Sequence, residues 1–289
     1  MTTLSTSVNT TQPTVSYTSA TNDEQLVISW LRLKKASTAK TYSIAIKQFL
    51  TAVNVPLQQL TVDDVAIWVE NLKAKLRPNT VKNKLSAIKS LLTYGQKIGY
   101  LTFNVGSAIT AENAKDNLAY KLLTKDERNA LINQATGRDR LILRFMVATG
   151  VRVSELCGLT WDDLSSNGSG GQATIFGKGS KTRTVLIPQR LWADLMATDR
   201  KSDYVFTSKR GGSLSRKTIN WMVNKYAKEA GITKTVSPHS LRHTHSVEAI
   251  EGGCDLHLLQ QSLGHSDLST TSRYLHARPN EGSSQFVDV

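Results

Sequence analysis

Apolar residues recur every three or four positions through the first third of the chain, a spacing that places them on one face of a helix. The second stretch shows this clearly, with Ile46, Phe49 and Val53 on one side. Connections between the stretches are short, so the pattern predicts a small all-α unit over residues 23–108. The expected helical stretches are 22–35, 37–53, 61–76 and 77–101.

Helix starts are marked by side chains able to accept the free backbone N–H groups of a first turn. Thr61 precedes the third stretch in this way. Thr124 with Glu127 forms a capping-box pattern. Ser237 is followed by Pro238, which is favoured at the first helical position. These signals predict helix boundaries along the whole chain.

The apolar period shortens at one place only. Two β-prone runs, 173–176 and 184–187, surround a Gly/Lys/Ser turn and predict a hairpin. The polar stretch 109–121 is typical of a linker, leaving 122–289 as a second domain. The fold class is therefore mainly α with a small antiparallel β-sheet. Further helices are expected at 124–135, 138–150, 153–164, 191–196, 215–230, 238–252 and 255–264.

The charge balance narrows the range of partners. The chain has 36 Lys and Arg against 23 Asp and Glu, a net charge of +13 and a pI of about 9.7. Binding a polyanion releases its counterions, so this surface favours nucleic acid, the alternative being a basic protein without such a partner. One cluster contains only positively charged residues. It is either a surface that follows the phosphates of a nucleic acid or an ordinary solvated helix face. Its members are Lys73, Lys75, Arg77, Lys82, Lys84 and Lys89.

Other features bear on location. Cys157 and Cys254 are the only cysteines and form no CxxC, which predicts a reducing cytoplasm. No run approaches the ~18 apolar residues that a membrane span needs, so no membrane partner is expected. Residues 1–22 lack the basic and apolar regions of a signal peptide, and this Thr/Ser-rich leader is predicted to be disordered.

Several residues have the chemistry to act on a phosphate, although each has a plainer explanation when taken alone. His239 and Arg242 are three apart and share a helix face; Arg holds two oxygens and His exchanges a proton. A surface pair explains them equally simply. Arg152 follows Gly150 at a helix junction, where pairing with Glu155 is the alternative role.

The remaining candidates lie in turns and near the end of the chain. Lys178 lies between glycines at the hairpin tip, where backbone can approach a ligand, although turn lysines are common. Its spacing is not that of a Walker A loop. Tyr274 lies close to Arg273 and His276, yet such a tyrosine usually packs in a core or on a surface. The histidines form no HExxH motif, so no metal site is predicted.

In chain order, however, these pieces match one pattern. The order Arg, Lys, His-x-x-Arg, Leu-Gly-His and Tyr resembles the tyrosine recombinase, or phage integrase, family, with an Xer-like layout. The resemblance covers roughly residues 23–276. These five elements at plausible spacings make coincidence a poor explanation. They lie in four segments, ATGVRVSELCGL, GKGSKTR, HSLRHTHS and LGHSDLSTTSRY, and the resemblance also includes STAKTY and TVDDVAIWVE in the first half of the chain.

This resemblance implies a mechanism. Tyr274 would attack a DNA phosphate, giving a 3′-phosphotyrosyl link and a free 5′-hydroxyl. Arg152 and Arg242 would hold the non-bridging oxygens, where charge gathers in the transition state. Lys178 would protonate the leaving 5′-oxygen. His239 would serve acid/base transfer at the tyrosine.

The family pattern also implies supporting roles for further residues. His265 would hydrogen-bond or place the phosphate, and Glu155 would orient the site. Lys181 and Arg183, in the same motif as the general acid, are added to the candidate DNA contacts. Arg, Lys and His supply the charge stabilisation that other phosphoryl-transfer enzymes take from Mg²⁺, so neither a metal nor any other cofactor is implied. ATP is unnecessary because the phosphotyrosine keeps the bond energy.

The implied architecture has two DNA-binding parts. A four-helix core-binding domain, SAM-like in fold, and an α+β catalytic domain would form a C-shaped clamp on double-stranded DNA. Homo- or hetero-tetramers would assemble on two DNA sites, without a small-molecule substrate. The segment after Tyr274 contains Pro279 and Gly282 instead of a long amphipathic pattern. Its expected docking residues are Phe286 and Val287.

Two other functions remain open at this stage. A DNA-binding protein of the same fold without catalysis would keep its DNA affinity in Tyr274→Phe. A type IB topoisomerase-like enzyme would relax supercoiled DNA without a specific site. The motifs describe the phosphate site and not base recognition, so the target sequence stays open. Chromosome or plasmid dimer resolution and mobile-element integration or excision are equally compatible with them.

Overall fold

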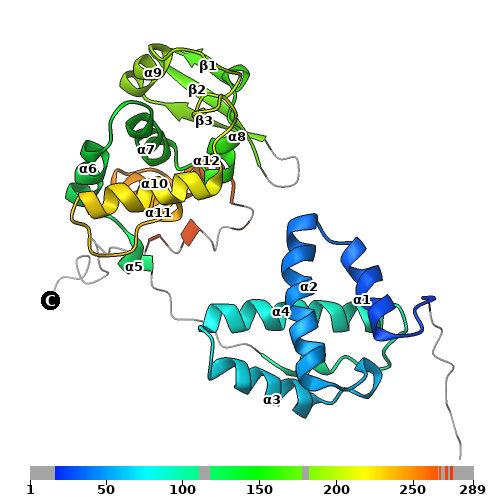
Figure 1. Cartoon of the computed structure of the whole chain (residues 1–289). Helices are drawn as coiled ribbons and strands as arrows, with labels where there is room; N and C mark the ends of the chain where they lie inside the picture. The colour runs from blue at the N-terminus through cyan, green and yellow to red at the C-terminus, as the bar shows by residue number, and fades with distance from the viewer. Residues whose placement is uncertain are drawn as a thin grey trace, which may run out of the picture. The chain divides into compact units, whose positions relative to one another are not determined.

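The computed structural model describes residues 17–110, 118–177, 182–265, 267, 271–272 and 274–275. The chain divides into two compact units, with the division between Asp116 and Asn117 (Figure 1). The predicted class, mainly helical with a small antiparallel sheet, is confirmed. In the described ranges, no helix combines the length and apolar character needed to span a membrane.

The first unit contains the four helices that the apolar pattern predicts. Asn22 accepts the N–H of Gln25 at 2.9 Å, and Thr61 forms a capping box with Asp64. These bonds satisfy first-turn donors where the sequence signals place them. The elements are α1 (Asp23–Arg32), α2 (Ala36–Val53), η1 (Leu57–Gln59), α3 (Val62–Lys73), α4 (Pro78–Lys97) and η2 (Val105–Ala108).

The apolar faces of these helices meet in one core. Phe49 of α2 packs edge-to-face against Trp68 of α3, with ring centroids 4.9 Å apart. Leu26, Leu85 and Ile88 are fully buried in the same cluster. Each helix therefore contributes the apolar face expected from its sequence period to this core.

The end of the predicted leader is part of this unit. The N–H of Tyr17 donates to the carbonyl of Ile98 at 2.9 Å, and that of Thr21 donates to Gln25 Oε1 at 2.8 Å. Ala20 packs on the helical core. Backbone hydrogen bonds thus hold residues 17–22, which composition alone assigns to a disordered leader; residues 1–16 lie outside the described ranges.

The second unit packs helices around and beside a three-stranded sheet. A short helix begins at Leu118, inside the stretch predicted as linker, and the capping box of Thr124 with Glu127 is confirmed. The elements are α5 (Leu118–Lys121), α6 (Lys125–Gln134), α7 (Gly137–Thr149), α8 (Val153–Gly158), η3 (Trp161–Asp163), β1 (Leu164–Asn167), β2 (Gly170–Phe176), β3 (Thr182–Ile187), α9 (Gln189–Met196), α10 (Arg216–Glu229), α11 (Pro238–Glu251) and α12 (Leu256–Leu263).

The sheet has the order β1-β2-β3, and both pairings are antiparallel. The predicted hairpin is β2–β3, in which Phe176 pairs with Thr182 at the loop end. β1 was not predicted, because its sequence, LSSN, is polar and exposed and lacks an apolar alternation. α9 packs on β2, where a Cβ at Gly171 would lie 2.1 Å from Trp192 Cε3. Glycine is therefore required for this contact.

Helix α11 lies at the centre of the second unit and contacts α5, α7, α10 and α12 (Figure 1). Ser237 and Pro238 begin it as the sequence predicts. Most of its residues are buried, including the polar Arg242, His243 and Thr244. Buried polar groups require partners, so this helix brings hydrogen-bonding side chains into the protein interior.

Candidate active site

The junction between α7 and α8 positions Arg152. Gly150 ends α7 with φ +61°, and a Cβ there would lie 2.5 Å from His245 Cδ2. Both the left-handed backbone and this close approach require glycine. Two residues later, Arg152 donates its backbone N–H to Glu155 Oε2 at 2.7 Å and its Nη1 to Glu155 Oε1 at 2.9 Å. Its Nη2 donates to the carbonyl of Gly264 at 3.1 Å.

Glu155 binds two guanidinium groups. Arg183 donates Nη1 to Oε1 at 2.9 Å and Nη2 to Oε2 at 2.7 Å, while its Nε donates to the carbonyl of Ser262 at 2.7 Å. Burial favours a raised pKa at Glu155, but hydrogen bonds and charges from Arg183 and Arg152 outweigh it and hold this pKa below its usual value. The carboxylate is therefore ionised and aligns Arg152.

Arg242 occupies the interior of the site, with 2% of its surface exposed. Its Nη1 donates to the carbonyl of Gly150, and its Nη2 donates to the carbonyl of Leu263 at 2.7 Å. Burial, followed by the charge of Arg152, lowers the pKa of Arg242 to about 10. The guanidinium is still charged at neutral pH and is held rigidly by backbone oxygens of the α7–α8 junction and the end of α12.

His265 is bound on both ring nitrogens. Nε2 lies 3.0 Å from Nη2 of Arg242, and Nδ1 lies 2.8 Å from Oγ1 of Thr271. Arg can only donate, so Nε2 accepts and Nδ1 carries the ring proton. Burial and the charges of Arg242, Arg152, Arg183 and His239 lower the pKa of His265 to about 4. The imidazole is neutral at physiological pH. We call Arg152, Glu155, Arg183, Arg242 and His265 the cationic cluster.

Tyr274 lies next to this cluster. Its ring is 6.4 Å from that of His265 between centroids, and its surface is 4% exposed. Apolar neighbours include Leu263. Its hydroxyl is 2.9 Å from Nδ1 of His243, whose ring centroid lies 4.0 Å from that of His239. The structure thus brings the predicted Arg152, Arg242, His239, His265 and Tyr274 into one region.

Several groups of this region were not predicted. His243 follows Arg242 and lies one helical turn after His239, so the i, i+4 spacing in HSLRHTHS was the available signal. The carbonyls of Gly150, Leu263 and Gly264 carry no sequence signal, because any residue has a backbone oxygen. His245 donates its Nδ1–H to the carbonyl of Val147 at 2.8 Å and supports the junction from behind Gly150.

The predicted DNA contacts have different positions. Lys178 and Lys181 lie outside the described residues. Arg183 is enclosed, with 10% of its side chain exposed and its guanidinium occupied by Glu155 and Ser262. Lys89 donates Nζ to the carbonyl of Ile109 at 2.7 Å, and Lys84 donates to Gln48. Of the cluster of positively charged residues predicted between positions 73 and 89, the exposed members are Lys73, Lys75, Arg77 and Lys82.

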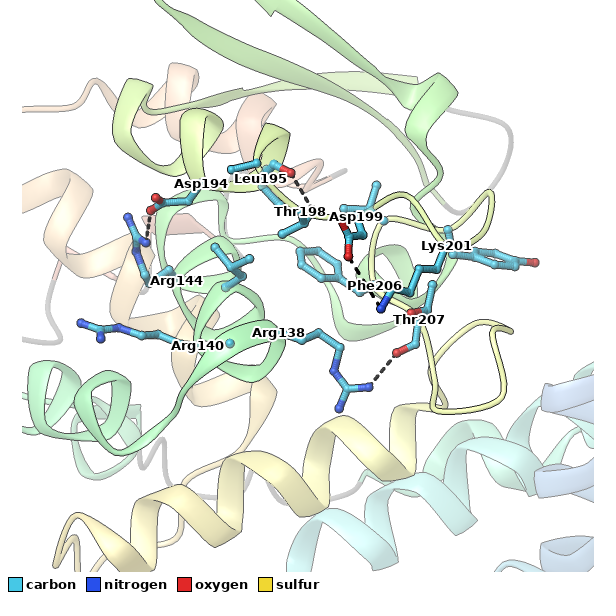
Figure 2. Close-up of a pocket in the computed structure, with 15 residues that line it drawn as sticks. Arg138, Arg140, Arg144, Asp194, Leu195, Thr198, Asp199, Lys201, Phe206 and Thr207 are labelled. Carbon is cyan, nitrogen blue, oxygen red and sulfur yellow. Dashed lines mark hydrogen bonds and ion pairs between the residues drawn. The ribbon is translucent and has the colours of Figure 1, made fainter.

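A cavity of about 710 Å³ in the second unit shares no residue with the cationic cluster. Figure 2 shows three of its basic residues, Arg138, Arg144 and Lys201, directed at protein groups, whereas Arg140 extends away from those groups. Arg144 pairs with Asp194, Arg138 donates to the carbonyl of Thr207, and Lys201 lies 3.8 Å from Asp199. These cations are engaged by the cavity's own walls and do not converge on one point, so the cavity does not form an anion site.

Two family models match the chain. The model described as phage integrase family matches residues 121–281, and the model described as phage integrase, N-terminal SAM-like domain, matches residues 28–98. The two matched ranges fall in the two compact units. Together with the four helices, the second match confirms the predicted SAM-like fold of the first unit.

Curated relatives carry the name tyrosine recombinase XerC. The protein from Pelobacter propionicus is 30% identical over 257 residues, covering 83% of this chain and 84% of its own. The protein from Xanthomonas campestris pv. campestris is 34% identical over 211 residues, covering 70% and 65%. Both alignments are longer than either unit, so each extends into both.

Solved structures share the fold. XerA recombinase is 27% identical with a TM-score of 0.51, covering 89% of this chain and 94% of its own. A lambda integrase tetramer bound to a Holliday junction is 18% identical with a TM-score of 0.75, covering 91% and 80%. At that identity the second match concerns the fold alone.

Proposed function

The chain belongs to the phage integrase family and is a tyrosine-type site-specific recombinase, and from this we propose that it cuts and rejoins DNA strands through Tyr274. One observation carries the assignment of the nucleophile. Tyr274 lies beside buried Arg242 and His265, and its hydroxyl is hydrogen-bonded to an imidazole. A phenol in contact with a proton acceptor, next to fixed cations, suits attack on a phosphodiester.

In the first step, Oη of Tyr274 attacks the phosphorus and forms a P–O bond. Arg152 and Arg242 donate to the non-bridging oxygens, where negative charge accumulates in the transition state. His265, neutral and with Nε2 next to Arg242, helps place the phosphate. Both guanidinium groups are oriented before DNA binds, because Glu155 and backbone carbonyls hold them in the folded protein. Little reorganisation is then needed in the transition state.

The bond to the 5′-oxygen breaks in the same step. Lys178, which lies between β2 and β3 in the sequence, is proposed to protonate this leaving oxygen, because it occupies the lysine position of the family pattern. The products are a 3′-phosphotyrosyl enzyme and a free 5′-hydroxyl. Attack by a 5′-hydroxyl of the partner strand reverses these transfers and releases Tyr274. The covalent link conserves the phosphodiester, so rejoining needs no external energy source.

DNA next to the scissile phosphate is proposed to lie along a groove between α10 and the start of α11. This hollow of about 720 Å³ is lined by His239, which is exposed, and by Arg216, Lys217 and Trp221 of α10. Trp221 is 65% exposed, unusual for a large aromatic side chain. Basic and aromatic groups beside the site suit a nucleic-acid backbone and its bases.

Further DNA is proposed to bind the first unit, on the exposed basic residues at the end of α3 and the start of α4. As partners we propose double-stranded DNA and further copies of this chain or of a related recombinase, in a tetramer on two sites. The lambda integrase tetramer on a Holliday junction, which has the same fold, supports this assembly.

A nicked suicide duplex tests the proposal, because the short fragment that carries the freed 5′-hydroxyl diffuses away after cleavage and the covalent intermediate is trapped. The duplex is drawn from the DNA that the protein enriches in a binding selection. The wild type is expected to form an adduct that runs slowly in denaturing gels and maps to Tyr274. Tyr274→Phe retains DNA binding and forms no adduct. A wild-type protein that binds this DNA but never forms the adduct would contradict the proposal.

A further inference from the structure

We propose that His243, and not the neighbouring His239, accepts the phenolic proton when Tyr274 attacks DNA. This inference rests on the proposed function and adds a catalytic residue to it. His243 lies outside the His-x-x-Arg pair that the sequence pattern singles out, directly after Arg242 in α11.

The first argument is direct contact. Nδ1 of His243 lies 2.9 Å from Oη of Tyr274, and the ring centroids are 5.5 Å apart. Both side chains are buried, with exposures of 7% for His243 and 4% for Tyr274. When the phenol donates, Nδ1 is the acceptor and the ring proton is on Nε2. A general base must be within hydrogen-bonding distance of the proton it removes, and His243 meets this condition.

His265 is the second imidazole close to Tyr274, but its chemistry is unsuitable. Nε2 accepts from Arg242, and Nδ1 is engaged by Thr271. With both nitrogens occupied, it has no lone pair for the phenolic proton. Its pKa of about 4, lowered by burial and by the charges of Arg242 and Arg152, describes a weak base. His265 therefore fits the placement of a phosphate better than proton transfer.

His239 has a different position. It lies one turn before His243 on α11, is exposed, and meets the ring of His243 edge-on with centroids 4.0 Å apart. It also lines the groove that is proposed to receive DNA. This arrangement suits a residue at the solvent end of the site, which contacts DNA or takes up the proton after His243 has accepted it.

Arg242 links the acceptor to the reacting phosphate. It is the neighbour of His243 in the sequence, and its guanidinium bonds to the carbonyls of Gly150 and Leu263. His265 accepts from Nη2 of Arg242 at 3.0 Å, and its ring stacks on that of Tyr274 with centroids 6.4 Å apart, so one imidazole neighbours both the guanidinium and the phenol. A phosphate held by Arg242 thus lies near the hydroxyl that His243 contacts.

The step balances as follows. The O–H bond of Tyr274 breaks, its proton moves to Nδ1 of His243, and the oxygen electron pair forms the bond to phosphorus. The 5′-oxygen leaves with a proton from the general acid, proposed above as Lys178. During rejoining, the imidazolium of His243 returns its proton to Oη as the phosphotyrosyl bond breaks.

The test is single-turnover cleavage of the suicide duplex by His243→Asn, whose amide reaches the position of Nδ1 but cannot take up a proton. We expect the rate to fall by about 10²–10⁴-fold, the usual contribution of a general base. His243→Gln is the second variant, and His239→Gln is the matched control on the same helix. Thermal unfolding and DNA affinity of each variant report on folding and binding.

A fluorinated tyrosine at position 274 separates proton transfer from packing. Its more acidic phenol ionises without a base, so it is expected to restore at least about tenfold of the rate lost in His243→Asn and to leave the defect of His239→Gln unchanged. Full-rate cleavage by a folded His243→Asn protein, or a defect that the fluorinated residue does not relieve, would overturn the proposal. A wild type without any adduct would instead refute the recombinase function.

Discussion

Arg183 and Glu155 form a two-point ion pair, with Nη1–Oε1 and Nη2–Oε2 distances of 2.9 and 2.7 Å. The pair joins β3 to α8, and the third bond of Arg183 reaches Ser262 at the end of α12. Gly264, which has φ +65°, lies against Arg183; a Cβ there would be 3.1 Å from Cδ of Arg183. One guanidinium thus fixes three segments that carry the candidate active site.

Removing Arg183 is therefore expected to weaken both folding and cleavage. Arg183→Met leaves an ionised, 5%-exposed Glu155 with Arg152 as its remaining partner. The expected loss of stability is therefore below the about 3–5 kcal/mol that an entirely uncompensated buried charge costs. Urea unfolding measures the loss. Arg183→Met combined with Glu155→Gln is expected to recover part of it, since no buried carboxylate is then left short of a partner and the Arg152 side chain is 39% exposed. Equal stability of Arg183→Met and the wild type would contradict this role.

Gly150 is expected to tolerate no side chain. In Gly150→Ala, the left-handed backbone conformation lowers the free energy of unfolding by about 1 kcal/mol or more. The new Cβ also collides with His245 and Leu263, which lowers it further. Gly137→Ala is the matched control, because its φ is also positive, +50°, but nothing lies within 4 Å of its added Cβ. Thermal unfolding should show a clearly larger loss for Gly150→Ala. Equal losses would mean that only backbone conformation matters at Gly150.

Stability is expected to fall in mild acid because of His265. Its folded pKa of about 4 is below the usual 6.5, so the unfolded chain binds a proton that the folded chain does not. Lowering the pH from 6.5 toward 4 therefore favours unfolding. His245, whose pKa burial also lowers, acts in the same direction. The pKa of Glu155 is held below its usual value of 4.5, so this carboxylate adds to the loss of stability only when the pH falls below 4.5.

Replacing His265 should reduce this acid sensitivity. Urea unfolding of His265→Asn at about pH 7 and about pH 5 is expected to show a smaller difference than the wild type. The remaining difference reports on His245 and other groups. An unchanged difference would show that protonation of His265 is not coupled to folding.

DNA affinity should depend differently on two lysines of the same helix. Lys82 is exposed on α4, and Lys82→Gln is expected to lower the slope of log K against log salt by about 0.9 if it neutralises one phosphate. Lys89→Gln is the comparison, because Lys89 is partly buried, with Nζ bound to the carbonyl of Ile109, whereas Lys82 is exposed. Fluorescence anisotropy over a salt series measures both. Identical slopes for Lys82→Gln and the wild type would remove Lys82 from the DNA surface.

Local patterns predicted much of the fold because their causes are local. The spacing of Ile46, Phe49 and Val53, the capping box of Thr61, and the Ser237–Pro238 start each involve residues within a few turns. The order of the motifs was similarly sufficient to indicate the family. By contrast, β1 is a strand because β2 supplies its hydrogen bonds, and its own residues carry no such signal.

The linear sequence thus established which side chains are available for the chemistry and which helices carry them. Only tertiary packing decided how they are used. It encloses Arg183 with Glu155 instead of exposing it, engages both nitrogens of His265, and places His243 against Tyr274. These contacts join residues up to 31 positions apart in the sequence. Other contacts of the site, such as that of Arg242 with Leu263, use a backbone carbonyl, a group that every residue has. Their formation depends on burial and distance in three dimensions, which no local pattern encodes.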